Sequence, residues 1–337
     1  MSGEMLCRYY RCCLSVGRHQ RASALFRHNN ISRSLSDIFV PPKKENALKK
    51  TQNDSQPAIS TPPVTPAMLD PLQTMTKITQ TGAVRARRPT DEMFVSSILG
   101  GAYISFGGCL SLMMGAQDLS HPLTSALVFP MGLSLIVLSG VDLLTSNMMY
   151  GTLPFLTHPR RTIKTKLNDL KKLWSVNLAG NLTGCVFIAA AASTLLFPTG
   201  TAAANLAAAI ATKKCSYSFG VAFGKAVGAN WLVNLGVFSA TTSNTTPGKM
   251  AALWMPITAF VALGLEHSVA NMFFLPLGML CGAEITIADM CVDNLMPVLL
   301  GNMVGAAIFT GTAKWFVTGG RQRRLEEISA SDDKDAR

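Results

Sequence analysis

Long stretches without a charged residue dominate the sequence from residue 93 onward. A helix needs about 20 mainly apolar residues to cross a bilayer. The uncharged stretches are Met93–Gln117, Pro122–Val141, Leu143–Thr157, Leu173–Thr212, Ala226–Gly248, Met250–Ala283 with only Glu266 and His267 inside it, and Asn294–Ala313. They predict an all-α membrane protein with six transmembrane helices, at about 94–115, 122–156, 173–197, 217–241, 250–282 and 295–316. Only 15% of the residues are charged, which argues against a soluble globular enzyme.

The loop between the second and third predicted helices sets the orientation. It carries one acid, Asp169, and a cluster of bases, namely Arg160, Arg161, Lys164, Lys166, Lys171 and Lys172. By the positive-inside rule, this loop and both termini face the cytoplasm, stroma or matrix. The formal net charge is +11, but no patch of Lys and Arg is interleaved with aromatic residues, so we expect no nucleic-acid partner.

The first 92 residues have a different composition. Residues 1–36 hold several Arg and Ser residues and one acid, Glu4. This is typical of an organelle transit peptide or of a disordered basic tail. Residues 37–92 are rich in Pro, Thr, Lys and Gln, which predicts a disordered linker. The transmembrane domain is then expected over 93–316 and a tail on the cytoplasmic, stromal or matrix side over 317–337. The expected location is the plastid envelope or mitochondrial inner membrane, with the plasma membrane as the alternative.

Two pairs of segments repeat. Asp142-Leu-Leu-Thr-Ser-Asn147-Met resembles Glu266-His-Ser-Val-Ala-Asn271-Met, and Gly180-Asn181-x-x-Gly184 matches Gly301-Asn302-x-x-Gly305 at nearly the same separation. Three spans per half make this an inverted repeat, because an odd number brings the second half into the membrane from the opposite side. The second and fifth spans, which carry the acids, are too long for one straight crossing. They are predicted to be broken helices, and paired broken helices bind substrates near the membrane midplane in transporters.

Buried polar residues cluster at the two predicted breaks. An ionisable group at mid-membrane costs about 2.5–3.5 kcal/mol. We expect the two acids to accept backbone N–H groups that a broken helix frees, with direct contact to substrate as the alternative, and the asparagines to bind the same backbone. The residues assigned to helix-break support are Asp142, Asn147, Asn181, Asn230, Glu266, Asn271 and Asn302.

His267 differs from these because Leu143 stands at its place in the first half. Its imidazole could donate a hydrogen bond or a proton to a small anion, with the Thr145 hydroxyl on the facing break. Eight cysteines show no CxxC pair and no matching His spacing, so no metal site and no cofactor is expected.

At these residues the chain resembles the formate/nitrite transporter family, over about 93–316. The matching motifs are Gly140-Val-Asp142-Leu-Leu-Thr145-Ser-Asn147, Gly228-Ala-Asn230-Trp231-Leu232-Val233 and Gly264-Leu-Glu266-His267-Ser-Val-Ala-Asn271-Met272-Phe273. The run Leu253–Thr286 is similar to the plastid nitrite/bicarbonate branch of green algae.

The resemblance implies an aquaporin-like protomer, a homopentamer with one pore per subunit, and passage of small monovalent anions (nitrite, formate and bicarbonate) or their acids, and a link to protons through the central histidine is our hypothesis. The resemblance also implies a central polar pair of His267 and Thr145. The roles that follow by position are one constriction by Phe129 and Phe260, another by Leu133 and Leu143, and a vestibule lysine at Lys214. The departures from the family pattern are Asn234, Gly236, Leu144 and Ser96. Ser96 replaces a lysine of some members, so less positive charge is expected in one vestibule.

Two other classes of function are considered. A neutral-solute channel of the same fold would fit the topology, but neither break contains an Asn-Pro-Ala motif. An intramembrane enzyme lacks a second His or Cys ligand near His267, and it lacks Ser–His or paired-carboxylate spacing. We therefore expect a channel or transporter that is not an enzyme. Two proton routes remain open: the anion is protonated in the vestibule, or His267 supplies the proton.

Overall fold

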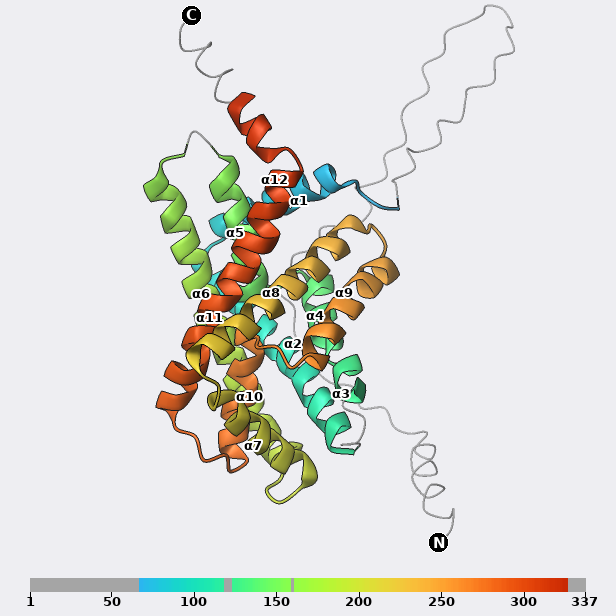
Figure 1. The fold of residues 1–337 in the computed structure, drawn as a ribbon, viewed down its shortest axis with the longest axis vertical. Helices are drawn as coiled ribbons and strands as arrows, with labels where there is room; N and C mark the ends of the chain where they lie inside the picture. The colour runs from blue at the N-terminus through green and yellow to red at the C-terminus, as the bar shows by residue number, and fades with distance from the viewer. Residues whose placement is uncertain (1–66, 118–122, 159–160, 327–337) are drawn as a thin grey trace, which may run out of the picture. The chain divides into compact units, whose positions relative to one another are not determined.

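The computed structural model describes residues 67–117, 123–158 and 161–326, and these form a bundle of helices (Figure 1). The predicted segment 1–36 and most of the final tail lie outside the described residues. The helices are α1 (Pro71–Arg87), α2 (Thr90–Gln117), α3 (Leu123–Val128), α4 (Pro130–Ser139), α5 (Leu144–Thr157), α6 (Ile163–Leu195), α7 (Ala202–Cys215), α8 (Phe219–Thr242), α9 (Thr246–Ala262), α10 (Ser268–Leu280), the π-helix η2 (Asp289–Leu295), α11 (Met296–Val304), the π-helix η3 (Gly305–Thr312) and α12 (Ala313–Val317).

Within the described residues, four helices are long and apolar enough to cross a membrane: α2, α6, α8 and the continuous rod from η2 to α12. Helices α3 and α4 continue into α5 with a bend of 45°, and this broken pair makes a fifth candidate span. The predicted fifth span is divided between α9 and the short apolar helix α10, so neither part qualifies alone.

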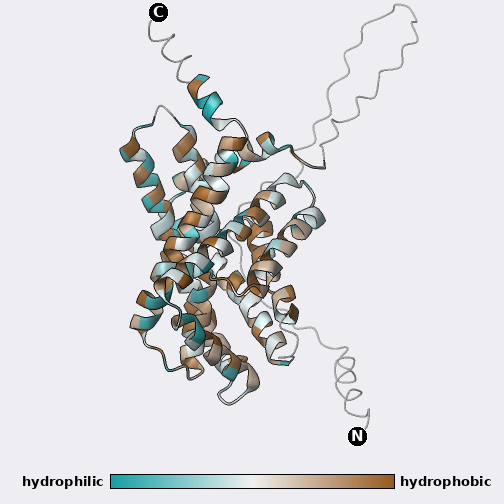
Figure 2. Ribbon diagram, viewed as in Figure 1, coloured by the Kyte–Doolittle hydropathy of each residue, from teal (hydrophilic) through white to brown (hydrophobic). Residues whose placement is uncertain are grey.

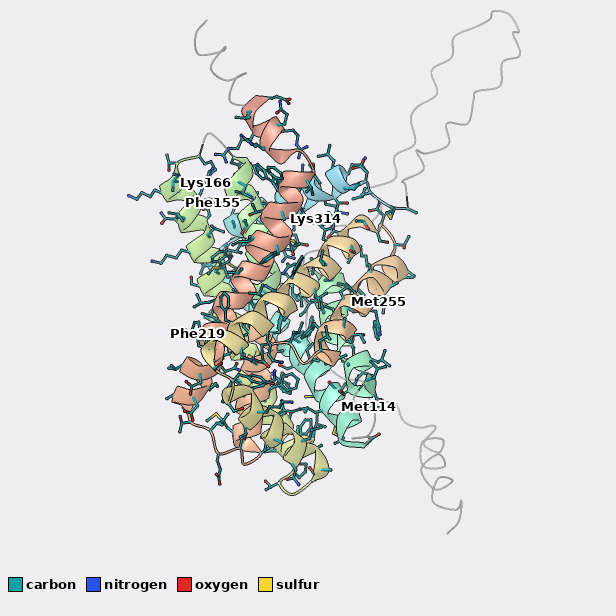
Figure 3. The ribbon with its side chains drawn as sticks, viewed as in Figure 1. Met114, Phe155, Lys166, Phe219, Met255 and Lys314 are labelled. Carbon is teal, nitrogen blue, oxygen red and sulfur yellow. The ribbon has the colours of Figure 1, made fainter. Side chains whose placement is uncertain are left out.

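Apolar side chains cover the outside of these helices as well as their inside. In Figure 2 the brown of hydrophobic residues runs along the helix bodies, and Phe219 and Met255 lie on the outer surface in Figure 3. Met255 is 80% exposed and Phe219 is 53% exposed. Outward apolar residues and inward polar ones are what a helical protein needs when its surroundings are lipid.

Helix α1 lies where the sequence predicted a linker, so that prediction is wrong for residues 71–92. Its start is fixed by a capping box in which Asp70 accepts from the Gln73 N–H at 2.8 Å and the Gln73 side chain accepts from the Asp70 N–H at 3.1 Å. Met75, Ile78 and Ala86 are buried, and α1 packs against α5. The buried residues of α1 lie on one face of the helix and its other faces are mostly polar, so the mean hydropathy of the whole helix is low.

Helix α7 is a second helix that the sequence analysis did not predict, because most of it lies within the uncharged run Leu173–Thr212. The chain leaves α6, turns at Gly200 with φ +87°, and restarts at Thr201, whose hydroxyl accepts from the Ala204 N–H at 3.2 Å. Alanines of α7 pack against α10 and α2. The last turn of α7 carries Lys213 and Lys214, where cations complement the helix dipole.

The two halves pack alike. Helix α2 lies along α6 in the first half, and α8 lies along α11 in the second. Helices α8 and α11 can approach closely because Gly301 has no side chain: a Cβ there would lie 2.4 Å from the Phe223 carbonyl oxygen. This packing brings Asn181 of α6 and Asn302 of α11 to the two breaks.

Candidate functional site

The two helix breaks have the same backbone conformation. Helix α4 ends at Gly140 with φ +73°, and the segment after α9 turns at Gly264 with φ +61°. Both values lie in the left-handed region that glycine adopts without strain. The next helices begin after extended N-cap residues, Leu143 and His267, with φ values of −117° and −122°. Leu143 and His267 therefore occupy corresponding positions.

One asparagine clamps each break. The Leu144 N–H donates to Asn181 Oδ1 and the Ser268 N–H donates to Asn302 Oδ1, both at 2.8 Å. In return, Asn181 Nδ2 donates to the Asp142 carbonyl at 3.1 Å, and Asn302 Nδ2 donates to the Glu266 carbonyl at 3.0 Å. Each amide thus satisfies a donor and an acceptor that the interrupted helix leaves open.

The two acids do not accept the freed backbone N–H groups, so that part of the prediction is wrong. Asp142 Oδ1 accepts from Asn147 Nδ2 at 3.0 Å, and Glu266 Oε2 accepts from Asn271 Nδ2 at 2.7 Å. Both carboxylates are buried, and a buried charge requires a countercharge as well as hydrogen bonds. The acids therefore hold the first turns of α5 and α10 through side chains.

The countercharges come from helices that the sequence reading did not identify. Lys214 Nζ of α7 lies 3.0 Å from Oε1 of Glu266. Arg88, just after α1, pairs with Asp142, and Arg85 Nη1 lies 3.4 Å from the same carboxylate. Ser96 Oγ accepts from the Asp142 N–H at 2.9 Å. Positive charge thus reaches the first break from α1, although Ser96 itself has none.

Two further asparagines complete these clusters. Asn147 donates to Asn177 Oδ1, and Asn271 donates to Asn294 Oδ1 at 2.7 Å. Sequence reasoning missed both acceptors. Asn177 lies four residues before Asn181, on the same face of α6, and that spacing was the available signal. Asn294 lies in the π-helix η2, whose register the sequence does not show.

Helix α8 connects the two breaks. Asn230 Nδ2 donates to the Thr145 carbonyl at 3.1 Å and to the Asn302 carbonyl at 2.7 Å. Asn234, one turn later, donates to the same Thr145 carbonyl at 3.2 Å. All four side chains are fully buried. The first turn of α5 is therefore fixed to the clamp of the other half.

The structure brings His267 and Thr145 into contact. His267 Nε2 lies 2.9 Å from Thr145 Oγ1, and His267 Nδ1 accepts from the Ala270 N–H at 3.2 Å. Because Nδ1 is an acceptor, the neutral imidazole carries its proton on Nε2 and donates it to the hydroxyl oxygen. The hydroxyl proton of Thr145 is then available to another acceptor.

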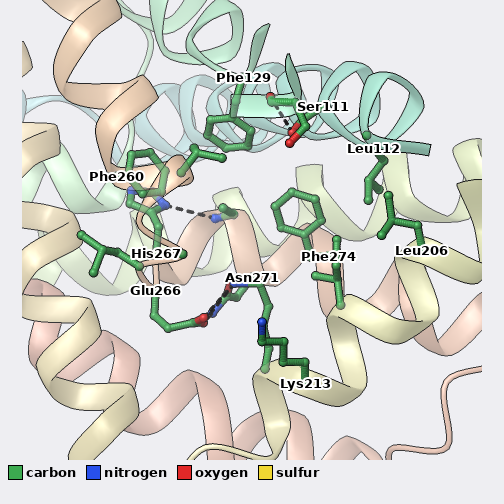
Figure 4. Close-up of a pocket in the computed structure, with 18 of the residues that line it drawn as sticks. Ser111, Leu112, Phe129, Leu206, Lys213, Phe260, Glu266, His267, Asn271 and Phe274 are labelled. Carbon is green, nitrogen blue, oxygen red and sulfur yellow. Dashed lines mark hydrogen bonds and ion pairs between the residues drawn. The ribbon is translucent and has the colours of Figure 1, made fainter. Parts of the chain in front are cut away.

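Two cavities meet at this pair. The larger, about 350 Å³, is lined by Lys213, Lys214, Glu266, Asn271, Phe274 and other residues, and Figure 4 shows it. The smaller, about 10 Å³, has room for about one water and is lined by Leu133 and Leu143 among others. Phe129, Phe260 and His267 line both cavities. The rings of Phe129 and Phe260 meet edge to face, with centroids 5.6 Å apart.

The arrangement fits the passage of a small polar solute between apolar side chains. Every residue assigned from the sequence to the central pair, the constrictions and the vestibule lines one of these cavities or contacts a residue that does. Among the described residues, no group of three or more His, Cys, Asp or Glu side chains is placed to hold a metal ion.

Comparisons of the sequence and of the fold with known proteins agree on one family. The family model for formate/nitrite transporters matches residues 72–316. A protein of Methanothermobacter thermautotrophicus, named "Probable formate transporter", is 39% identical over 69% of this chain and 91% of its own length. A solved "FNT family ion channel" has a TM-score of 0.65 at 29% identity, and covers 73% of this chain and 98% of its own. A "Pentameric formate channel with formate bound" has a TM-score of 0.60 at 27% identity, and covers 68% and 97%.

Proposed function

The chain belongs to the formate/nitrite transporter family, and from this premise we propose that it carries nitrite, formate and bicarbonate across a membrane in a proton-linked manner, along a path that passes His267. The family consists of transporters and channels, not of enzymes. The observation that carries the proposal is the His267–Thr145 pair, which lies 2.9 Å apart between two cavities that share Phe129 and Phe260 as walls.

The proposed architecture is six spans in two inverted three-helix repeats, assembled as a homopentamer with one pore in each subunit. The paired clamps of Asn181 and Asn302 at equivalent breaks support the repeat. The broken span of α9 and α10 would be the sixth crossing beside the five candidates that qualify by length. A similar solved channel is pentameric.

The proposed path runs from the larger cavity to the smaller one. Lys214 stands in the outer vestibule, Phe129 and Phe260 form the first constriction, and His267 with Thr145 forms the central pair. Leu133 and Leu143 form the second constriction. All of these residues except Thr145 line at least one of the two cavities, which supports this order.

A bare anion between apolar constrictions would be costly, so neutralisation has to precede passage. Positive charge at the vestibule concentrates the anion, and the falling dielectric toward Phe129 raises the pKa of the solute until it takes a proton. The cap at His267 favours this route over protonation of the imidazole. An imidazolium would carry a proton on Nδ1, which would face the Ala270 N–H donor instead of accepting from it.

The neutral acid then has polar partners at the centre. The hydroxyl proton of Thr145 is free to donate to a carboxyl or nitrite oxygen, because the oxygen atom of Thr145 already accepts from His267. The pair therefore replaces solvent hydrogen bonds without adding a fixed charge. A neutral, hydrogen-bonding centre suits a solute that crosses as its acid.

Stopped-flow uptake into proteoliposomes tests the function. We expect nitrite, formate and bicarbonate to enter faster than into protein-free vesicles, and nitrite and formate uptake to accelerate under an inward proton gradient. Uptake of glycerol or urea without anion uptake would instead support a neutral-solute channel. Absence of any protein-dependent flux would refute transport.

The proposed address is an organelle membrane, and the proposed branch of the family is the plastid nitrite/bicarbonate branch of green algae. The basic, Ser-rich composition of residues 1–36 and the run Leu253–Thr286 support it. A fluorescent fusion of residues 1–92 tests the address. Plastid or mitochondrial fluorescence is expected, and diffuse cytosolic fluorescence would refute a transit peptide.

A further inference from the structure

Lys214, the lysine assigned to the outer vestibule, adds no net charge there because it is paired with Glu266. Lys214 Nζ lies 3.0 Å from Oε1 and 3.1 Å from Oε2 of Glu266. The Glu266 side chain is only 2% exposed and contacts Asn271 as well, so the carboxylate is fixed in place. Two opposite unit charges in contact act on a distant anion only as a dipole. The recruiting charge has to come from other residues.

Two other lysines lie at or beside the same cavity: Lys213 lines it, and Lys225, which is not itself among the lining residues, contacts two residues that are. Lys213 is exposed at the end of α7. Lys225 of α8 donates from Nζ to the Gly264 carbonyl at 2.9 Å, and its Nζ lies 5.0 Å from the centroid of the Tyr217 ring. Gly264 and Tyr217 both line the cavity. Lys225 is therefore held at the cavity wall by two contacts that leave its charge intact.

No carboxylate forms an ion pair with either of these two lysines within the described residues. The ion pairs there join Arg85 and Arg88 to Asp142, Arg161 to Asp169, and Lys214 to Glu266. Of the acids that follow α10, Glu284 lies in the loop and Asp289 and Asp293 lie in η2, and none of the three is among the residues that line the cavity. Glu266 is thus the cavity's acid, and Lys214 cancels it.

We propose that Lys213 and Lys225 supply the net positive charge that draws anions into the outer cavity, and that Lys214 serves to neutralise Glu266. The inference rests on the proposed transport of small monovalent anions and names the residues that capture them. Lys225 is the better placed of the two, because its contact with Gly264 fixes the charge beside the segment that leads to Glu266 and His267.

The sign and range of the effect follow from electrostatics. Unpaired charges at a cavity mouth raise the local anion concentration and the rate of entry, and salt screens this attraction. Removal of both charges should therefore raise the apparent KM for anion entry about threefold to tenfold at low ionic strength. The difference should shrink at high ionic strength, and the flux at saturating anion should change little.

The test compares variants in proteoliposomes with nitrite as the probe. Lys213→Gln, Lys225→Gln and the double variant are measured at low and high ionic strength beside the wild type. Lys225→Arg keeps the charge. Lys249→Gln is the control for loss of a lysine elsewhere, because Lys249 lies in the first turn of α9 and is not among the residues that line the cavity. The Gln variants should raise KM and flatten its salt dependence, and Lys225→Arg and Lys249→Gln should match the wild type.

Wild-type KM and salt dependence in the double variant would overturn the proposal. So would a Lys225→Arg variant that behaves like Lys225→Gln, because charge would then not be what matters. Lys213→Glu keeps the test decisive if Lys225 variants fold poorly, since Lys213 is exposed and charge reversal there should raise KM further than Lys213→Gln. Failure of the wild type to carry anions would instead refute the proposed function itself.

Discussion

Nε2 of His267 lies 2.9 Å from Oγ1 of Thr145, although the two residues are 122 positions apart in the chain. The contact exists because each residue opens the half-helix after a break: His267 is the N-cap of α10, and Thr145 lies in the first turn of α5. Each break thus contributes one residue to this contact.

Removal of the Thr145 hydroxyl should slow transport and leave the fold intact. Thr145→Val keeps the shape but loses a hydrogen bond worth about 1 kcal/mol, so nitrite flux should fall about tenfold or less, and Thr145→Ser should retain it. Thr152→Val is the matched control on α5, because the Thr152 hydroxyl donates only to its own helix, at the Met148 carbonyl. Unchanged flux in Thr145→Val would contradict the role of the pair.

Replacement of His267 separates its two contacts. His267→Asn preserves an N-cap side chain that can accept from the Ala270 N–H, whereas His267→Phe loses the cap and the imidazole together. Both variants should lose anion flux in proteoliposomes, but only His267→Phe should lose about 1 kcal/mol of stability in addition. Equal thermal stability of the two would show that the cap adds nothing.

Loss of the Asn302 clamp should destabilise the protein strongly. Asn302→Leu leaves the Ser268 N–H and the carbonyls of Glu266 and Ala226 without this partner. At about 1–3 kcal/mol for each unsatisfied buried group, the cost is about 3 kcal/mol or more. Thermal unfolding in detergent measures it, with Asn205→Leu as control because Asn205 is exposed on α7. Equal melting of the two variants would disprove the clamp.

The pair of Lys214 and Glu266 should show strong coupling in a double-mutant cycle. Lys214→Met leaves a buried carboxylate without its countercharge, which costs about 3 kcal/mol or more. Adding Glu266→Gln to Lys214→Met should recover much of that loss, because the remaining amide carries no charge. Chemical unfolding of the four proteins measures the coupling, and additive losses would rule it out.

Cys215 should react with thiol reagents only at high pH. Burial raises the pKa of its thiol to about 11, and the carboxylates of Asp289, Asp293 and Glu266 act in the same direction. Since the thiolate is the reactive form, about one thiol in a thousand is reactive at pH 8. Peptide mapping after iodoacetamide treatment should show modification of Cys215 that rises as the pH approaches 11. Complete modification near pH 7 would contradict this.

Residue patterns predicted the breaks and most of their polar residues for two reasons. Each helix interruption needs side chains that bind the freed backbone groups, and the two halves contain similar sequence motifs at the breaks. The patterns could not show that Asn181 and Asn302, not Asp142 and Glu266, take the freed N–H groups. That choice depends on how α6 and α11 lie across the breaks, and the close approach at Gly301 sets this only in three dimensions.

Helices α1 and α7 escaped prediction for different reasons. Helix α1 has one apolar face, so its composition resembles a linker, yet the box of Asp70 and Gln73 and the four-residue spacing of Ile78, Gly82 and Ala86 were readable signals. Helix α7 continues an alanine-rich run in which only the turn at Gly200 marks a restart. These two helices supply Arg85 and Lys214, so the pairing of Arg85 with Asp142 and of Lys214 with Glu266 was not predicted, although Lys214 itself was named as a vestibule residue.

The bonds of Asn230 have a mechanical consequence. One amide group donates to the carbonyl of Thr145 and to that of Asn302, so it links the two halves of the protein between the two helix breaks. A rocking cycle would break these bonds at every turnover. Transport that leaves these bonds intact would need only local movements, such as rotation of the Phe129 and Phe260 rings that line both cavities.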